Sequence, residues 1–188
     1  MSTTRERIIQ ASSALFMERG YSASGLKQIS VASDATIGSL YHFFPGGKEE
    51  LAAETLQASG AAYQALVESV FDAAPDMATG VRDCFAGAAA VLRATDYADA
   101  CPIATVALEV ASSDEGLRQV TADIFESWLE SATVRLERDG VEPVRARELA
   151  TVFIAALEGG FLLSRAAKDT SAMDAIGEAM VQLVKAAR

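Results

Sequence analysis

The sequence has few of the residues on which metal sites and nucleophilic catalysis depend. Among its 188 residues there are one histidine, His42, and two cysteines, Cys84 and Cys101. A lone histidine leaves a metal centre short of nitrogen ligands, and no second histidine is present to activate a nucleophile. A glycine-rich phosphate loop and a nucleophile elbow are also absent from the sequence. We therefore expect no enzyme activity, no metal and no cofactor.

Long apolar runs are missing as well. No stretch reaches the ~18 uncharged apolar residues of a membrane-spanning helix. Charged residues fall within the opening MSTTRERIIQ, where a secretory signal would be apolar. The expected compartment is the cytoplasm, in which Cys84 and Cys101 would remain thiols. Whether either cysteine has a redox role stays open.

The sequence also lacks the alternating β-branched runs that are typical of strands. Apolar residues recur at helical spacing instead, and proline, glycine or capping residues separate the segments. The expected class is all-α, with about nine helices, of which three lie at the N-terminus. The later segments are expected at about 48–72, 77–94, a short helix from Pro102, one from Ser113 or Asp114 to Arg138, 143–168 and 171–187.

Basic residues are scarce, and the net charge of −10 argues by itself against a nucleic-acid partner. The charge is unevenly distributed, however. Residues 1–48 carry five basic and three acidic side chains, whereas the other 140 residues carry 11 basic and 23 acidic ones. We therefore expect two domains, 1–48 and 49–188, that differ in electrostatic character.

The first 48 residues have the layout of a helix-turn-helix. Three helices fit into about 45 residues, and a turn of about three or four residues joins the last two. Gly20 is expected to end the first helix in the left-handed conformation, and Ser24 is expected to cap the second. The other expected caps and stops are Thr3 or Thr4, Ser33-Asp34, Thr36 and Pro45-Gly46-Gly47.

The second helix of a helix-turn-helix lies in the major groove with its N-terminal residues toward the bases. Here that helix is 36–44, and its end contains four adjacent rings, Tyr41 to Phe44. Phe43 and Phe44 would seat the helix, while hydroxyls and backbone N–H groups would bind phosphates, so few lysines are needed. The predicted DNA-binding residues are Ser24, Lys27, Thr36, Ile37, Gly38, Ser39, Tyr41, His42 and Lys48.

This region resembles the DNA-binding signature of TetR/AcrR-family transcriptional repressors. The resemblance covers, in order, Gly20-Tyr21-Ser22-Ala23-Ser24 through Ile29, and then Gly38 through Leu51. Similarity to the LmrA/YxaF-like branch of the family lies in Gly46-Gly47 before Lys48, in Cys101-Pro102-Ile103-Ala104 and in Leu108-Glu109.

The resemblance implies a homodimeric repressor that binds a palindromic operator through the helix 36–44. It also implies release by a small molecule bound in a C-terminal ligand-binding and dimerisation domain. The sequence departs from the family pattern at Ser33-Asp34, Ile37 and Phe43, so the operator sequence is not implied. The alternative is a helical adaptor or small-molecule-binding protein without operator binding. Whether the protein represses or activates transcription stays open.

A dimer interface is predicted where small residues cluster between Ala155 and Phe161. Small residues permit close helix approach, and two copies of the last two helices would form a four-helix interface about a two-fold axis. The alternative is that Gly159-Gly160 only kinks the helix of a monomer. The predicted interface residues are Ala156, Gly160, Phe161, Ile176, Met180 and Leu183.

A ligand site is predicted where apolar side chains from several helices meet a few polar groups. Its rings favour a small apolar or aromatic inducer. For Phe125 and Trp128 the alternative is ordinary core packing, and for Glu109 it is a solvated charge. The predicted ligand-binding residues are Phe71, Phe85, Tyr97, Cys101, Val106, Glu109, Phe125 and Trp128.

Overall fold

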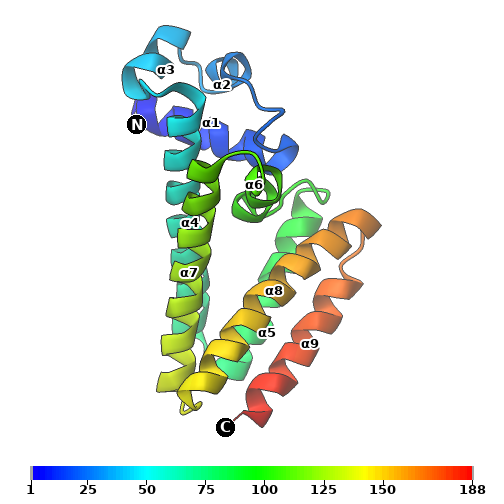
Figure 1. Cartoon of the computed structure of the whole chain (residues 1–188). Helices are drawn as coiled ribbons and strands as arrows, with labels where there is room; N and C mark the ends of the chain where they lie inside the picture. The colour runs from blue at the N-terminus through cyan, green and yellow to red at the C-terminus, as the bar shows by residue number, and fades with distance from the viewer. Residues whose placement is uncertain (1, 188) are drawn as a thin grey trace. The chain divides into compact units, whose positions relative to one another are not determined.

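The computed structural model describes residues 2–187, and every regular element in that range is an α-helix (Figure 1). The helices are α1 Thr4–Arg19, α2 Leu26–Ala32, α3 Ile37–Phe43, α4 Gly47–Ala73, α5 Met77–Ala94, α6 Pro102–Val110, α7 Glu115–Arg138, α8 Pro143–Ala167 and α9 Ser171–Ala186. Within the described range, the all-α class and the nine helices expected from the sequence are confirmed.

Capping residues and prolines set many of the helix ends. Thr3 caps α1, because its Oγ1 accepts the N–H of Glu6 at 3.2 Å while its own N–H donates to the Glu6 carboxylate at 2.8 Å. Pro102 and Pro143 open α6 and α8 at a position where a helix needs no N–H. The helix ends expected from the sequence therefore agree with the structure to about two residues.

Two expected helix ends were wrong in detail. Gly25, not Ser24, is the N-cap of α2. The Ser24 hydroxyl is instead buried and donates to the carbonyl oxygens of Leu15 at 3.2 Å and Gly20 at 2.7 Å. Gly20 does end α1 with a positive φ of 80°, but its ψ of 174° is extended, so it is not in the left-handed helical conformation.

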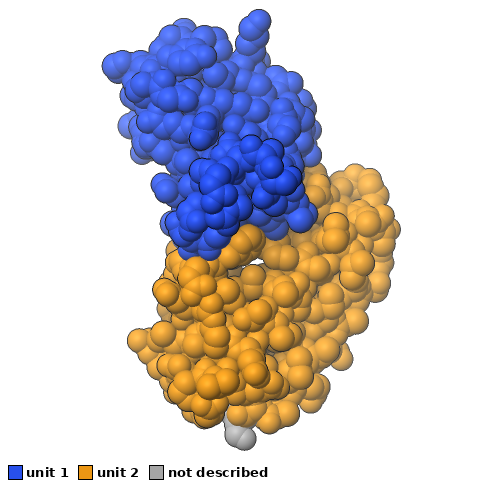
Figure 2. Space-filling view, viewed as in Figure 1, with its two compact units in different colours: residues 1–62, 101–124 blue, residues 63–100, 125–188 orange. Residues whose placement is uncertain are grey.

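Contacts group the chain into two units (Figure 2). The first unit contains the segment through Ala62 together with Cys101–Ile124, and the second contains Tyr63–Ala100 and the segment from Phe125 onward. This grouping differs from a single division at residue 48, because α6 and the first parts of α4 and α7 belong with the N-terminal helices. The domain boundary at residue 48 stays a prediction.

The first unit is built around α1. This helix packs against α2 and α6, and α2 packs in turn against α3. The first half of α4 and the start of α7 add further apolar side chains. Its most buried apolar residues include Ile8, Phe16, Ile29, Leu40, Phe44, Leu51, Leu56, Ile103, Val106, Val110 and Leu117. The three N-terminal helices thus share a unit with later segments of the chain.

In the second unit α5, α8 and α9 pack on one another. Gly177 allows α9 to approach α5 closely, since a Cβ added there would lie 2.7 Å from the Cβ of Phe85. The rings of Phe71 and Phe85 each contact Phe153 edge-on, with centroids 6.0 Å and 5.7 Å away. Rings from α4, α5 and α8 therefore meet in one apolar core.

A ladder of polar pairs joins α4 to α7 within the second unit. The pairs are Gln64 with Ser127 at 2.9 Å, Glu68 with Ser131 at 2.7 Å and Asp72 with Arg135 at 2.7 Å. Both helices advance by four residues from pair to pair, so they run parallel along this ladder. Hydrogen bonds from Ser131 and Gln64 lower the pKa of the Glu68 carboxyl, because they stabilise its charged form.

α8 is long and apolar enough to cross a membrane, judged by length and composition alone, and 28% of its most apolar stretch is buried. Glu158 and Arg165 interrupt the apolar residues of this helix, so the absence of a long uncharged run in the sequence did not predict it. Leu162 and Leu163 on α8 are 67% and 53% exposed. The helix therefore has one face in the core of the unit and an apolar face outside it.

The close approach of α5 and α9 yields a stability prediction. Gly177→Ala should lower the free energy of unfolding by about 1–3 kcal/mol, because the added methyl group overlaps Phe85 and overpacks the core. Gly87→Ala is the matched control, since Gly87 lies in α5 with nothing within 4 Å of an added Cβ. It should stabilise the helix by up to about 1 kcal/mol. Urea unfolding followed by circular dichroism measures both, and equal effects of the two substitutions would contradict the close approach.

Candidate nucleic-acid interface

The helix-turn-helix consists of α2, the turn 33–36 and α3. Asp34 has φ 50°, a left-handed conformation that aspartate tolerates better than most residues. Arg7 on α1 donates from Nε to the carbonyl oxygen of Ser33 at 3.2 Å and from Nη2 to that of Asp34 at 3.4 Å. α1 thus anchors the turn through two backbone carbonyls, a role for Arg7 that the sequence analysis missed.

The N-terminus of α3 is capped and exposed. Thr36 Oγ1 accepts the N–H of Ser39 at 3.1 Å and lies 3.0 Å from the Ser39 hydroxyl. Ile37 and Gly38 are exposed, and the first turn of any helix has N–H groups without intrahelical partners. The start of α3 therefore presents hydroxyls, N–H groups and one apolar side chain to an approaching molecule.

The rings at the end of α3 divide between surface and core. Tyr41 is 52% exposed and His42 is exposed, whereas Phe44 is buried at 1%. Phe43 is half-buried, and its ring contacts that of His42 edge-on at 5.1 Å. The Arg5 guanidinium lies 5.6 Å from the centre of the Phe44 ring. Phe44 therefore anchors α3 in the core, while Tyr41 and His42 are accessible at the surface.

Several polar side chains of the first unit form contacts within that unit. Arg5 forms an ion pair with Glu54 of α4. The Ser24 hydroxyl is buried, as described above, so the prediction that it contacts DNA is corrected: it holds the connection between α1 and α2. Lys27, in contrast, is exposed on α2.

Lys48 also makes internal contacts, although it was predicted to bind a phosphate. Its Nζ donates to the carbonyl oxygen of Tyr21 at 2.7 Å and lies 4.1 Å from the centre of the Tyr21 ring. Partial burial lowers the pKa of Lys48, and the nearby Glu109 carboxylate opposes that shift. The ammonium group is thus held against the loop between α1 and α2.

The predicted ligand-binding residues fall into both units. In the second unit, Phe85 is buried in the core, Phe71 is half-buried at its edge, and Phe125 contacts Trp128 edge-on at 5.4 Å. Tyr97 is half-buried with φ 62°, and its carbonyl oxygen accepts from Arg165 Nε at 3.1 Å. The structure brings Phe71 and Phe85 to a common ring, Phe153, and places Phe125 beside Trp128.

The other three predicted ligand-binding residues lie on or next to α6 in the first unit. Val106 is fully buried, and Cys101 Sγ accepts the N–H of Ala104 at 3.4 Å as the N-cap of α6. Glu109 accepts backbone N–H groups from the loop between α1 and α2. A role for Glu109 in ligand binding stays a prediction, but its carboxylate is neither simply solvated nor without a partner.

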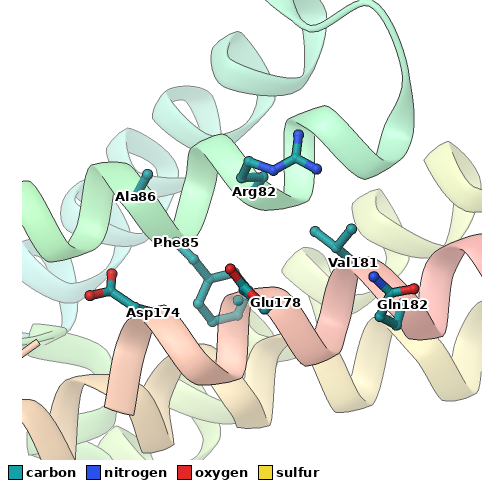
Figure 3. A pocket seen from close by; sticks show the side chains of 8 residues that line it. Arg82, Phe85, Ala86, Asp174, Glu178, Val181 and Gln182 are labelled. Atoms are coloured by element: carbon teal, nitrogen blue, oxygen red, sulfur yellow. The ribbon is translucent and has the colours of Figure 1, made fainter. Parts of the chain in front are cut away.

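A groove of about 400 Å³ lies between α5 and α9 in the second unit (Figure 3). The residues that line it are Arg82, Phe85, Ala86, Asp174, Gly177, Glu178, Val181 and Gln182. Phe85 is the member of this lining that the sequence had assigned to a ligand. The groove mixes charged and apolar side chains, so it lacks the mainly apolar lining of the predicted inducer site.

The two cysteines lie in the interior of the protein. Cys84 and Cys101 are both buried thiols. Burial raises the pKa of the Cys84 thiol to about 12, which keeps it protonated and therefore poorly nucleophilic. No group of three potential ligands for a metal ion occurs among residues 2–187.

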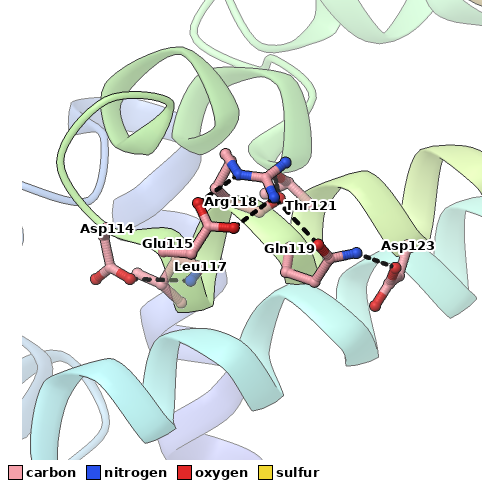
Figure 4. Close-up of polar contacts among 7 residues, drawn as sticks. All are labelled: Asp114, Glu115, Leu117, Arg118, Gln119, Thr121 and Asp123. Carbon is pink, nitrogen blue, oxygen red and sulfur yellow. Dashed lines mark hydrogen bonds and ion pairs between the residues drawn. The ribbon is translucent and has the colours of Figure 1, made fainter.

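The polar network at the start of α7 combines a helix cap with side-chain pairs within the helix (Figure 4). Asp114 Oδ1 accepts the N–H of Leu117 at 2.9 Å. Arg118 donates to both carboxylate oxygens of Glu115, at 2.6 and 2.7 Å, and Gln119 bonds Asp123 at 2.8 Å. These contacts stabilise the first turns of α7, and nothing in them requires a bound ligand.

Comparison with known proteins places the chain in a family. A family model described as bacterial regulatory proteins, tetR family, matches residues 8–55, and one for the C-terminal domain of LmrA/YxaF-like transcriptional regulators matches residues 77–179. The uncharacterized HTH-type transcriptional regulator YxaF of Bacillus subtilis is 35% identical over 182 residues, covering 97% of this chain and 95% of that protein. The chain belongs to the TetR family.

One further relative supports the family, and two solved structures have the same fold. The HTH-type transcriptional regulator LmrA of Bacillus subtilis is 32% identical, with 97% of each chain covered. A TetR regulator from Legionella pneumophila has the same fold, with a TM-score of 0.84, 24% identity and 97% of each chain covered. The regulator CifR, solved with operator DNA, has a TM-score of 0.81 at 22% identity, with 95% of each chain covered. The chain is therefore a transcriptional regulator with a DNA-binding domain, and not an enzyme.

Proposed function

We propose that the chain is a cytoplasmic transcriptional repressor that binds a palindromic operator as a homodimer and leaves it when a small apolar molecule binds. The exposed start of α3 carries the proposal. Thr36, Ile37 and Gly38 are exposed, whereas Leu40 and Phe44 behind them are buried. One face of α3 therefore packs on the protein while its N-terminal turn faces outward. A recognition helix that enters the major groove is exposed in the same way.

Phosphate binding in this proposal depends little on lysine. The hydroxyls of Thr36, Ser39 and Tyr41 donate to phosphate oxygens, and the N-terminus of α3 adds N–H groups and a partial positive charge. The exposed Lys27 and His42 lie on α2 and α3 and add two further contacts. The CifR structure, solved with 26 bp of operator DNA, supports this use of the shared fold.

Base reading is assigned to Ile37. It is 37% exposed at the first position of α3, and its side chain has no hydrogen-bonding group. An apolar side chain in the major groove discriminates through the 5-methyl group of thymine. We therefore expect at least one thymine in each half-site to be recognised by its methyl group.

Uracil substitution tests this assignment. Replacing the contacted thymine by uracil removes the methyl group. The wild type should then bind the operator about fourfold more weakly, because burial of one methyl group contributes about 0.8 kcal/mol to the binding free energy. Ile37→Ala should bind the thymine operator and the uracil operator with equal affinity. The control is Leu66→Ala, at an exposed position on α4, which should still bind the thymine operator more tightly. Fluorescence anisotropy with a fragment from beside the chain's own gene provides the measurement. Equal affinity of the wild type for both operators at every thymine would refute the assignment.

The dimer proposal rests on the unpartnered faces of α8 and α9. Val152, Leu162 and Leu163 on α8 and Leu183 on α9 are 39–67% exposed. Of the interface residues predicted from the sequence, Gly160 and Met180 are buried within the protomer, and Ala156, Phe161 and Ile176 are half-buried. A second copy would cover the same apolar faces on both protomers, as a two-fold interface requires.

Charge placed on the outer face of α8 should separate the dimer. The double substitution Leu162→Glu with Leu163→Glu should give a monomeric mass by light scattering at micromolar concentration, because burying two carboxylates in an apolar interface is costly. Helicity should be retained, since both residues are exposed in the protomer. The control is Val134→Glu on α7, also an exposed apolar position, which should remain dimeric. A monomeric wild type would refute the proposed interface.

The proposed inducer is a small apolar or aromatic molecule. Support comes from the rings of the second unit, where Phe71 and Phe85 meet Phe153 and Phe125 contacts Trp128. Rings of this kind bind aromatic ligands well. Release of the operator requires that the ligand bind more tightly to a conformation with weaker DNA affinity.

Titration with small aromatic compounds tests the inducer. The single tryptophan, Trp128, should change its fluorescence over the same ligand concentrations that release operator DNA. Trp128→Phe should lose the signal and keep the release, because phenylalanine retains an apolar ring. A compound that quenches Trp128 while the DNA complex persists would show binding without regulation. If the wild type bound such compounds and no operator, a ligand-binding protein without operator binding would be the better description.

A further inference from the structure

The loop between α1 and α2 is held by two side chains of opposite charge. The N–H groups of Tyr21 and Ser22 donate to Glu109 on α6, to Oε1 at 3.0 Å and to Oε2 at 2.8 Å. The carbonyl oxygens of the same two residues accept from Lys48 Nζ on α4, at 2.7 Å and 3.5 Å. One carboxylate thus accepts from the N–H groups of Tyr21 and Ser22, and one ammonium group donates to their carbonyl oxygens. The carbonyl oxygen of Tyr21 also accepts from the N–H of Ser24 at 3.1 Å.

The loop is shaped to admit the carboxylate. Gly20 has a positive φ of 80°, and a Cβ added there would lie 1.7 Å from Oε1 of Glu109. Glu109 therefore occupies space that a side chain at position 20 would take. The Tyr21 ring lies beneath Lys48 Nζ at 4.1 Å and contacts Phe16 edge-on at 5.8 Å, so the loop is also tied to the core of α1.

We propose that Glu109 and Lys48 are positioning residues for DNA binding, which together fix the loop 20–22 and thereby the placement of α2 and α3. This inference rests on the proposed operator binding. The loop leads through the buried Ser24 and the N-cap Gly25 directly into α2, and α2 packs against α3. Lys48 then acts through the loop and makes no phosphate contact, and Glu109 assists DNA binding although it carries negative charge.

Electrostatics alone predicts the opposite effect for Glu109. Removing a negative charge from a protein normally strengthens its attraction to DNA. In Glu109→Gln, however, only one oxygen remains to accept from two N–H groups, and the amide NH₂ faces the other donor. The positioning role therefore predicts about tenfold weaker operator binding for Glu109→Gln, the scale of a lost hydrogen bond to a charged group.

The salt dependence of binding separates the two roles of Lys48. The logarithm of the DNA-binding constant falls as the logarithm of the salt concentration rises. Each lysine that neutralises one phosphate makes that slope steeper by about 0.9. Lys48→Met should weaken binding about tenfold with that slope unchanged. The double variant Lys48→Met with Glu109→Gln should lose less than the product of the two single effects, because both act on one loop.

The matched control is Glu115→Gln, which removes the same charge from an exposed carboxylate that pairs with Arg118 at 2.6 Å. Operator affinity is measured by anisotropy across a salt series, and exchange of the Tyr21 and Ser22 amide protons is measured by NMR without DNA. We expect faster amide exchange and weaker binding in Glu109→Gln, and neither in Glu115→Gln.

The proposal is overturned if Lys48→Met reduces the salt slope by about 0.9 while Glu109→Gln binds as Glu115→Gln does. It is also overturned if amide exchange in the loop is the same in Glu109→Gln and the wild type. Failure of the wild type to bind any operator would instead refute the proposed function, and the exchange measurement would still decide whether Glu109 holds the loop.

Discussion

The DNA-binding helices of this chain are too few to form a stable core by themselves. Small domains bury a smaller fraction of their surface on folding, so three short helices need additional apolar cover. Here that cover comes from Leu51 and Leu56 on α4 and from Ile103 and Val106 on α6, all of which are fully buried. The unit that presents α3 is therefore assembled from two segments far apart in the sequence. The loop before α2 depends on that assembly directly, because Glu109 of α6 and Lys48 of α4 hold it.

This requirement explains how an acidic chain uses its few basic residues. Arg7 binds the carbonyls of the helix turn, Arg5 pairs with Glu54, and Lys48 binds the loop before α2. Basic side chains that a charge count would assign to phosphates thus hold backbone groups and carboxylates inside the unit. DNA binding, as proposed, depends mainly on hydroxyls, N–H groups and the dipole of α3. The low lysine content is consistent with this division.

Local features of the sequence were enough to predict the helices. Capping by Thr3 and Thr36, together with the prolines at the starts of α6 and α8, sets helix ends through contacts within a few residues. The three-helix layout of the first 48 residues also predicted the helix-turn-helix, and the resemblance to the TetR family supported it. Ser24 and Gly20 were the exceptions. The Ser24 hydroxyl donates to the carbonyl oxygen of Leu15, a contact that helical spacing does not predict, and Gly20 has an extended ψ of 174°.

Contacts between distant residues were beyond the sequence. Glu109 reaches the loop at Tyr21 across 88 positions, and the polar ladder of α4 and α7 joins residues 63 positions apart. The burial of Met180 and Gly160 inside the protomer follows from the packing of α8 on α9. Helical periodicity shows that a residue faces an apolar surface, but it does not show whether that surface belongs to the same chain or to a partner.

Hydroxyl-radical footprinting of the wild-type protein on DNA from beside its own gene tests whether two copies of α3 read one palindrome. We expect two protected half-sites with two-fold symmetry, whose centres lie about 34–36 Å apart, one turn of the double helix. A single protected half-site at saturating protein concentration would contradict it.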